Sequence, residues 1–351
     1  MAALPEPNHT TLARIYDAIK AAAESEEEIR SHLGASLIGR RCNRQLWLTF
    51  RWAEKKIFDG RMHRLFGTGH REEARIVEDL RRAGMEVHDT DGSGEQFRVS
   101  GIGGHFGGSM DGAVRGIPEA PKTWHVLECK TSNEKSFLKM KADGVKAAKP
   151  EHYAQMQTYM GYTGMDRAFY VMVNKNTDEL YTERVEFDPD AFDKFVAKAQ
   201  NVIAAAEPPP PISRDPSWYE CKMCDFRTLC HGDDVPQVNC RTCAHSTPEL
   251  DGDARWSCDR HAKDLSVDQQ VAGCGSHRYI PALLGRLGEL MRAENCEVEY
   301  QTKDGTKFVN GCGPGAFSSA EIREAGPSVG HKTVHALKAA FGATAVADIG
   351  P

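Results

Sequence analysis

Hydrophobic residues in the first part of the chain recur at the spacing of one helix face. Leu12, Ile15 and Ile19 fall three or four residues apart, so a helix would bring them to one side. Thr10 and Thr11 precede them and suit the N-terminal cap of that helix. With the helical patterns further along, the predicted helices span residues 10–30, 42–50, 62–83, 150–162 and 189–206.

Between these helices the pattern changes to short strands separated by glycine-rich turns. Strands are predicted over residues 97–99, 105–114, 124–130, 168–173 and 179–187. Because helices alternate with these strands, the order argues against a β-sandwich and predicts an α/β or α+β fold.

A cysteine-rich segment follows the four prolines at 208–211 and extends to about residue 280. The tail resumes a mixed pattern, with a helix predicted over 283–293, a hairpin over 297–309 and a helix over 333–341. Ser318 or Ser319, placed before Glu321, would cap a further short helix. The expected domains are an N-terminal helical segment 1–30, a core 31–232 closed by cysteines, a cysteine-rich module 233–282 and a small α+β region 283–351.

Composition narrows the class of protein. The 351 residues correspond to about two domains. With 40% hydrophobic and 27% charged residues, the chain has ordinary globular composition. No apolar run reaches the roughly 18 residues of a spanning helix, and no secretory signal is recognisable, so a cytoplasmic protein without a membrane anchor is expected. The net charge of −6 argues against a protein that coats nucleic acid, but it leaves room for a local basic cleft.

Two carboxylates and a lysine form the first candidate site. Glu128 and Lys130 alternate on one predicted strand, so they share a face. Asp111 lies in a neighbouring strand. Two carboxylates beside a lysine suit a divalent cation that activates a water, with the lysine orienting that water or stabilising the developing anion. Alone, Glu-x-Lys on a strand is usually a surface ion pair.

Three further features strengthen the catalytic interpretation. His70 ends a Gly-Thr-Gly-His run before a helical stretch, although alone it would be a surface histidine. Gln155 and Tyr159 are four residues apart and share a helix face, which otherwise indicates packing on a sheet. A basic stretch suited to phosphates, or else a solvated loop, contains Lys130, Lys135, Lys139, Lys141, Lys146 and Lys149.

Together, the order Gly-x-Gly-His, Asp-Gly, Glu-x-Lys and Gln-x3-Tyr resembles the RecB-like branch of the PD-(D/E)XK nuclease superfamily, over about residues 33–232. That branch includes the CRISPR-associated RecB-like exonucleases, the AddB nuclease domain and many phage exonucleases. The resemblance implies a restriction-endonuclease-like core, a central mixed sheet flanked by helices, that hydrolyses phosphodiester bonds with Mg²⁺ or Mn²⁺.

The resemblance also implies residue roles. His70, Asp111 and Glu128 would bind the metal, with the main-chain carbonyl of Cys129 as an extra ligand. Lys130 would be the catalytic lysine. The remaining matching residues, which would border the active site and contact nucleic acid or the lysine, are Gln155 and Tyr159.

Eleven cysteines in a chain without an export signal should be reduced, and clustered thiols then indicate metal ligands. Cys221, Cys224 and Cys230 have C-x2-C-x5-C spacing and leave one ligand position open, for which Cys42 is the natural fourth. Iron–sulfur RecB-like nucleases share this arrangement, so the resemblance implies a [4Fe–4S] cluster, although four thiolates also suit zinc. Buried free thiols better explain Cys129, Cys296 and Cys312.

A second cysteine set follows with the pattern C-x2-C-x14-C-x15-C, and its members are Cys240, Cys243, Cys258 and Cys274. The segment has little apolar material for a core, so a structural Zn²⁺ is expected. His261 and His277 each follow a cysteine closely, and either could replace a thiolate; His245 is a weaker alternative.

The expected function is a DNA exonuclease of phage or bacterial recombination or DNA processing, acting on single- or double-stranded DNA in a bacterial or phage-infected cell. A recombination or single-strand-binding protein would be a natural partner; polarity and oligomeric state stay open. Three alternatives use the same residues: a structure-specific endonuclease, a non-catalytic nucleic-acid-binding scaffold, and a redox sensor built on the cluster. The scaffold does not need Asp111, Glu128 and Lys130 together, and the sensor does not need Lys130.

Overall fold

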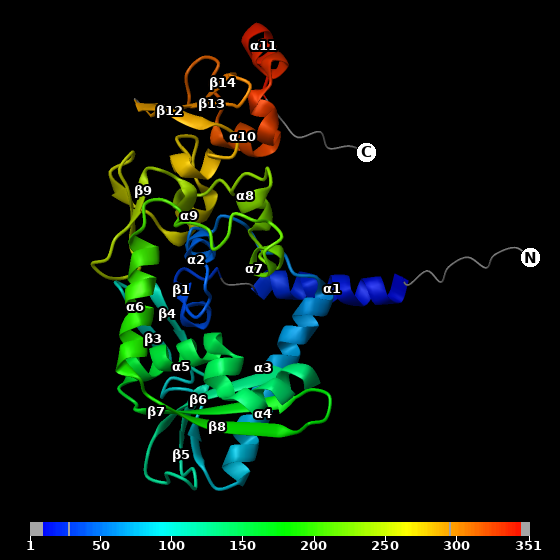
Figure 1. Cartoon of the computed structure of the whole chain (residues 1–351), viewed down its shortest axis with the longest axis vertical. Helices are drawn as coiled ribbons and strands as arrows, with labels where there is room; N and C mark the ends of the chain where they lie inside the picture. The colour runs from blue at the N-terminus through cyan, green and yellow to red at the C-terminus, as the bar shows by residue number, and fades with distance from the viewer. Residues whose placement is uncertain (1–9, 27–28, 295, 345–351) are drawn as a thin grey trace, which may run out of the picture. The chain divides into compact units, whose positions relative to one another are not determined.

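The computed structural model describes residues 10–26, 29–294 and 296–344. The chain, drawn in Figure 1, divides into two compact units. The first unit comprises Met1–Arg30, Lys56–Val99 and Gly108–Asp193, and the second comprises Ser31–Lys55, Ser100–Gly107 and Lys194–Pro351. The expected boundaries near residues 30, 232 and 282 stay a prediction.

A five-stranded mixed sheet forms the centre of the first unit, in the order β2-β5-β6-β7-β8. Figure 1 labels its strands β5, β6, β7 and β8. Only β6 and β7 pair in parallel; the other neighbours are antiparallel. Its strands are β2 (Glu86–His88), β5 (Gly112–Arg115), β6 (His125–Ser132), β7 (Arg167–Asn174) and β8 (Leu180–Glu186). Strand β7 is buried from Ala168 to Asn174, as expected for a central strand covered on both faces.

Helices cover both faces of this sheet. They are α3 (Gly60–Arg82), α4 (Glu134–Ala148) and α5 (Pro150–Thr163), whereas α1 (Thr10–Glu26) contacts α3. Ile76 and Leu80 of α3 pack in one apolar cluster with Phe169 of β7. The next residue of β7, Tyr170, faces the other way and bonds His152 of α5 (Tyr170 hydroxyl to Nδ1, 2.8 Å). Helix α3 and helix α5 therefore lie on opposite faces of the sheet.

Short elements make up the second unit. Its helices are α2 (Asn43–Phe50), α7 (Tyr219–Lys222), α8 (Arg227–His231), α9 (Val267–Ala272), α10 (Ser319–Ala325) and α11 (Lys332–Phe341). One antiparallel sheet has the order β11-β10-β9, from β9 (Ser246–Pro248), β10 (Trp256–Cys258) and β11 (Lys263–Asp264). Another has the order β12-β13-β14, from β12 (Glu289–Glu294), β13 (Glu297–Gln301) and β14 (Lys307–Asn310).

Three elements cross the boundary between the units along the chain: β3 (Arg98–Gly101), β4 (Phe106–Ser109) and α6 (Pro189–Ala204). Strand β4 pairs in parallel with β1 (Leu33–Gly34) of the second unit through Phe106 and Gly107. The single-turn 3-10 helices are η1 (Ala35–Leu37), η2 (Cys240–Thr242), η3 (Pro281–Leu284) and η4 (Gly326–Gly330).

The predicted mixed α/β architecture is confirmed, with local differences. The helix predicted over 283–293 is wrong: a 3-10 turn ends at Leu284, and Glu289–Glu294 is strand β12. Gly285 and Gly288 lower the helix propensity of this stretch, and pairing with β13 then decides its conformation. The strand predicted over 105–114 is two strands, interrupted at Met110 and Asp111. The predicted cap at Ser318 is confirmed as a capping box with Glu321.

No described helix is long and apolar enough to span a membrane.

Candidate active site

The candidate site begins at the end of strand β6, where two charged side chains share one face. The Lys130 ammonium donates a hydrogen bond to Oε1 of Glu128 and another to the carbonyl oxygen of Cys129 (3.2 Å). Glu128 is fully buried, and its Oε2 has no hydrogen-bond partner among the residues that the structure describes. A buried carboxylate oxygen without a partner is costly, so this atom marks a position where a cation would be stabilised.

Strand register brings Asp111 to the same place. Strands β5 and β6 are antiparallel with Gly112 opposite Leu127, so the preceding Asp111 comes opposite Glu128. The backbone N–H of Cys129 donates to Oδ2 of Asp111 at 2.7 Å, and the Lys130 nitrogen lies 3.8 Å from the same oxygen. The structure therefore brings Asp111, Glu128 and Lys130 together, as the sequence pattern predicts.

Helix α3 supplies two more polar side chains. A cavity of about 440 Å³ is lined by His70, Glu73, Asp111 and Lys130, together with the apolar Leu65 and Phe66. His70 lies within α3, which begins ten residues earlier at Gly60 because Asp59 caps its first turn by accepting from the Met62 N–H (2.7 Å). The histidine is exposed at the rim of the cavity.

Glu73 is a site residue that the sequence reasoning missed. It lies one helical turn after His70, so both side chains reach the cavity from one face of α3. The three-residue spacing from His70 could have indicated Glu73. Glu72 and Glu78 carry the same charge in the same helix, so the sequence did not single out Glu73 among them.

Burial sets the electrostatics of the site. It raises the pKa of Glu73 to about 7, and the negative charge of Asp111 adds to that shift. It also raises the pKa of Glu128, against the opposing effect of Lys130. Burial alone would lower the pKa of Lys130, but the carboxylates of Glu128 and Asp111 raise it above its ordinary value. The lysine is therefore cationic, while the raised pKa values of Glu73 and Glu128 mean that these two carboxyl groups retain protons more readily than exposed ones.

Gln155 and Tyr159 border the site from helix α5. The Gln155 amide donates to the Tyr159 hydroxyl (3.2 Å), and that hydroxyl donates to the carbonyl oxygen of Ser109 (2.7 Å), two residues before Asp111. Both side chains are buried. Their visible role is to hold the end of β4, from which the chain continues to Asp111.

The comparison with known protein families decides the classification. The profile of the PD-(D/E)XK nuclease superfamily matches residues 8–231, more than half of the chain. The chain belongs to the PD-(D/E)XK nuclease superfamily. The RecB-like branch within it stays a prediction. No curated protein sequence matches the chain.

Three solved structures illustrate what this PD-(D/E)XK chain is similar to. LHK-Exo in complex with dAMP has 19% identity and a TM-score of 0.38, covering 54% of this chain and 91% of that one. The alkaline exonuclease LHK-Exo from Laribacter hongkongensis has 19% identity, a TM-score of 0.37 and the same coverage. SSO0001 has 16% identity and a TM-score of 0.41, covering 63% of this chain and 96% of that one.

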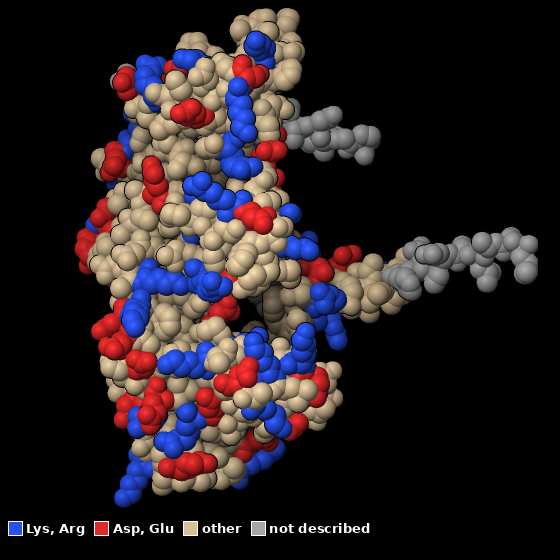
Figure 2. All heavy atoms as spheres, viewed as in Figure 1, with Lys and Arg blue, Asp and Glu red and all other residues tan. Residues whose placement is uncertain are grey.

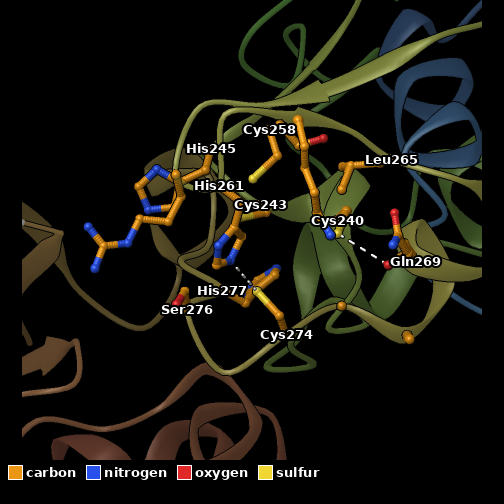
Figure 3. Close-up of a pocket in the computed structure, with 15 residues that line it drawn as sticks. Cys240, Cys243, His245, Cys258, His261, Leu265, Gln269, Cys274, Ser276 and His277 are labelled. Carbon is orange, nitrogen blue, oxygen red and sulfur yellow. Dashed lines mark hydrogen bonds between the residues drawn. The ribbon is translucent and has the colours of Figure 1, made fainter.

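The four cysteines of the first set line one small cavity in the second unit of this PD-(D/E)XK protein: Cys42, Cys221, Cys224 and Cys230. Cys42 caps helix α2, and the others come from α7, α8 and the turn between them. Burial raises the pKa of Cys230 to about 11, whereas Arg44 lowers it. The second set, Cys240, Cys243, Cys258 and Cys274, lines a different cavity (Figure 3). In the described residues, no three Cys, His, Asp or Glu side chains already converge in metal-binding geometry.

The lysine-rich stretch of the nuclease domain is helix α4 rather than a loop. Its Lys135, Lys139 and Lys141 are exposed, and Lys141 pairs with Glu179, which directly precedes β8 (2.6 Å). On the face drawn in Figure 2, basic and acidic side chains are interspersed rather than segregated. Lys175, which follows β7, lines the same cavity as Asp111 and Lys130 and adds a positive charge there.

Proposed function

We propose that this PD-(D/E)XK protein is a metal-dependent exodeoxyribonuclease whose active site contains Asp111, Glu128 and Lys130. The observation that carries the proposal is the fully buried Glu128 carboxylate, whose Oε2 lacks a partner beside Asp111 and a lysine held by both acids. Family membership supports the same chemistry. We assign the protein to the RecB-like branch and to phage or bacterial recombination or DNA processing on its sequence motifs.

The donor set fits Mg²⁺ or Mn²⁺. Asp111, Glu128 and the Cys129 carbonyl offer oxygen atoms, Glu73 adds a third carboxylate, and His70 adds a nitrogen at the rim. A bound divalent cation would supply Lewis-acid stabilisation of phosphoryl charge and lower the pKa of a water molecule.

The protein's own groups would divide the remaining work. Lys130 keeps its positive charge because two carboxylates surround it, so its ammonium can orient the attacking water or stabilise charge that develops on the phosphate. The Cys129 N–H holds Asp111 in place. Lys175 and the exposed lysines of α4 would contact the DNA backbone, as phosphate-neutralising residues do.

We further propose a [4Fe–4S] cluster on Cys42, Cys221, Cys224 and Cys230. Their convergence on one cavity and the one-plus-three order along the chain support it. Such a cluster would join the segment before the nuclease core to the segment after it. The same four thiolates suit zinc, so the iron content and visible absorption of anaerobically purified protein decide between them.

The nuclease proposal is tested on end-labelled single- and double-stranded DNA in Mg²⁺, Mn²⁺ or EDTA, after anaerobic purification. Glu128→Gln removes a charge at the site, and Glu179→Gln removes one from an exposed ion pair outside it. We expect metal-dependent release of short products by the wild type and by Glu179→Gln, and none by Glu128→Gln.

The product ladder separates the alternatives. Progressive shortening from labelled ends supports the exonuclease, whereas discrete internal fragments on branched substrates indicate the structure-specific endonuclease. Binding without cleavage by a folded, metal-loaded wild type would replace the proposal with the scaffold, and binding that changes with cluster oxidation would favour the redox sensor.

A further inference from the structure

The nuclease proposal does not use the second cysteine set, which lies in a polar module of the second unit. Four cysteines, three histidines and two basic residues line one cavity of about 510 Å³ there (Figure 3). The cysteines come from separate segments: Cys240 and Cys243 from the turn around η2, Cys258 from the end of β10, and Cys274 from the loop after α9. The fold therefore brings to one cavity cysteines that lie up to 34 residues apart in the sequence.

The backbone around these cysteines is already ordered. The Cys243 N–H donates to the Cys240 carbonyl (3.1 Å), and the His277 N–H donates to the Cys274 carbonyl (3.0 Å), so Cys240 and Cys274 each begin a tight turn. Backbone hydrogen bonds from Arg278 and His245 reach the Cys243 sulfur. Bonds of this kind fix a sulfur as a ligand.

The residues that line the cavity also suit a metal cation. Four cysteine sulfur atoms lie around it, and Arg260 and Lys263 line the same cavity, where they would offset part of the charge of four thiolates. A bound metal ion deprotonates coordinating thiols outright.

We propose that Cys240, Cys243, Cys258 and Cys274 bind one structural Zn²⁺. Four thiolates are a preferred zinc donor set and leave no open position for catalysis. The Cys240 thiol donates to the Gln269 carbonyl (3.3 Å), and the Cys274 thiol contacts Nε2 of His261 (3.6 Å). To bind zinc, both thiols must leave these partners and rotate toward the centre of the cavity. This site is independent of the nuclease proposal.

Two of the three histidines that line the cavity already have contacts there. His277 is buried, and its Nε2 is engaged with the Thr242 hydroxyl (3.2 Å). His261 is exposed and sits beside Cys274. The four-thiolate set therefore predicts that His261→Ala keeps the metal.

Zinc at this site would fix the turn that carries Arg241. The Arg241 side chain is buried and donates to the carbonyls of Phe50 (3.0 Å) and Ser31 (3.0 Å) and to Gln270 (2.9 Å). Its guanidinium lies 3.5 Å from the ring centroid of Trp52. The metal would thus hold the module against the 31–55 segment of its own unit.

The test is the zinc and iron content of the purified full chain, measured together by elemental analysis. We expect about one zinc per chain in the wild type, in His261→Ala and in the control Cys296→Ser, with loss of most zinc in Cys258→Ser and Cys274→Ser. Cobalt-substituted wild type should show thiolate charge-transfer absorption, which those two variants lose.

Three results would overturn the proposal: a wild type without zinc after growth in zinc, zinc retained in both Cys258→Ser and Cys274→Ser, or zinc lost in Cys221→Ser alone, which would place the metal at the first set. If the variants fail to fold, a mercurial titration of the wild type replaces them. Zinc release in step with thiol modification supports the site, and the absence of released zinc rejects it.

Discussion

The backbone N–H of Cys129 donates to Oδ2 of Asp111 at 2.7 Å, which ties the second acidic residue to the strand that carries the first. Because this bond uses the main chain, it constrains Asp111 whatever side chain stands at position 129. Nearby, Oε2 of Glu128 has no hydrogen-bond partner among the described residues and is available to a cation. The site is thus held by the sheet itself, as expected for a catalytic group on rigid elements.

The first prediction concerns Lys130. Lys130→Ala should lower the cleavage rate by about 100-fold or more, because it removes the only ammonium held between Glu128 and Asp111 in the described structure. DNA binding measured in Ca²⁺ should change little. The matched control is Lys307→Ala, which removes an exposed lysine paired with Glu299 of β13. Equal cleavage by Lys130→Ala and the control would show that the site is assigned wrongly.

The second prediction follows from Glu73, whose pKa is raised to about 7 by burial and by Asp111. The folded state then binds a proton more tightly than the unfolded state, for which the ordinary value is 4.5. In EDTA, this residue's contribution to stability is therefore fully present below pH 4.5 and is lost as the pH rises to about 7.

The Glu73 variant isolates this effect. In EDTA, the melting temperature of the wild type minus that of Glu73→Gln should fall as the pH rises from 5 to 7.5. Added Mn²⁺ should remove this pH-dependent difference. Glu72→Gln, one residue earlier and paired with Arg75, is the control. A pH-independent difference between wild type and Glu73→Gln would contradict the raised pKa.

Sequence alone predicts the site where local periodicity controls geometry. Alternation placed Glu128 and Lys130 on one face, and i, i+4 spacing placed Gln155 beside Tyr159. Glu73 could not be selected in this way, because its role depends on the packing of α3 against the sheet. Helix α4 was hidden because its lysines resemble a solvated loop, although Phe137 and Met140 are fully buried. Tertiary contacts also turned the stretch after Gly288 from a helix into a strand.

The third prediction concerns the support of Asp111 from helix α5. Tyr159→Phe removes the hydroxyl that donates to the Ser109 carbonyl, so it should cost about 1 kcal/mol of unfolding free energy in urea. The loosened Ser109–Asp111 segment should lower the cleavage rate by about tenfold, since small displacements of catalytic groups are costly. Tyr162→Phe, on the same helix, is the control. Unchanged kinetics with reduced stability would assign Tyr159 a purely structural role.

The last prediction concerns Arg241, the buried arginine between two cysteines of the second set. Arg241→Lys keeps the charge but cannot reach the Phe50 and Ser31 carbonyls together with Gln270, so buried acceptors lose their donors. We expect a loss of about 2–3 kcal/mol in the unfolding free energy of the second unit, with a changed near-ultraviolet signal from Trp52 and Trp256. Arg260→Lys, exposed at the zinc-site cavity, should leave both unchanged. If zinc holds the turn in place, chelation of the wild type should reproduce the spectral change of Arg241→Lys, whereas chelation without that change would separate the metal from the packing of Arg241.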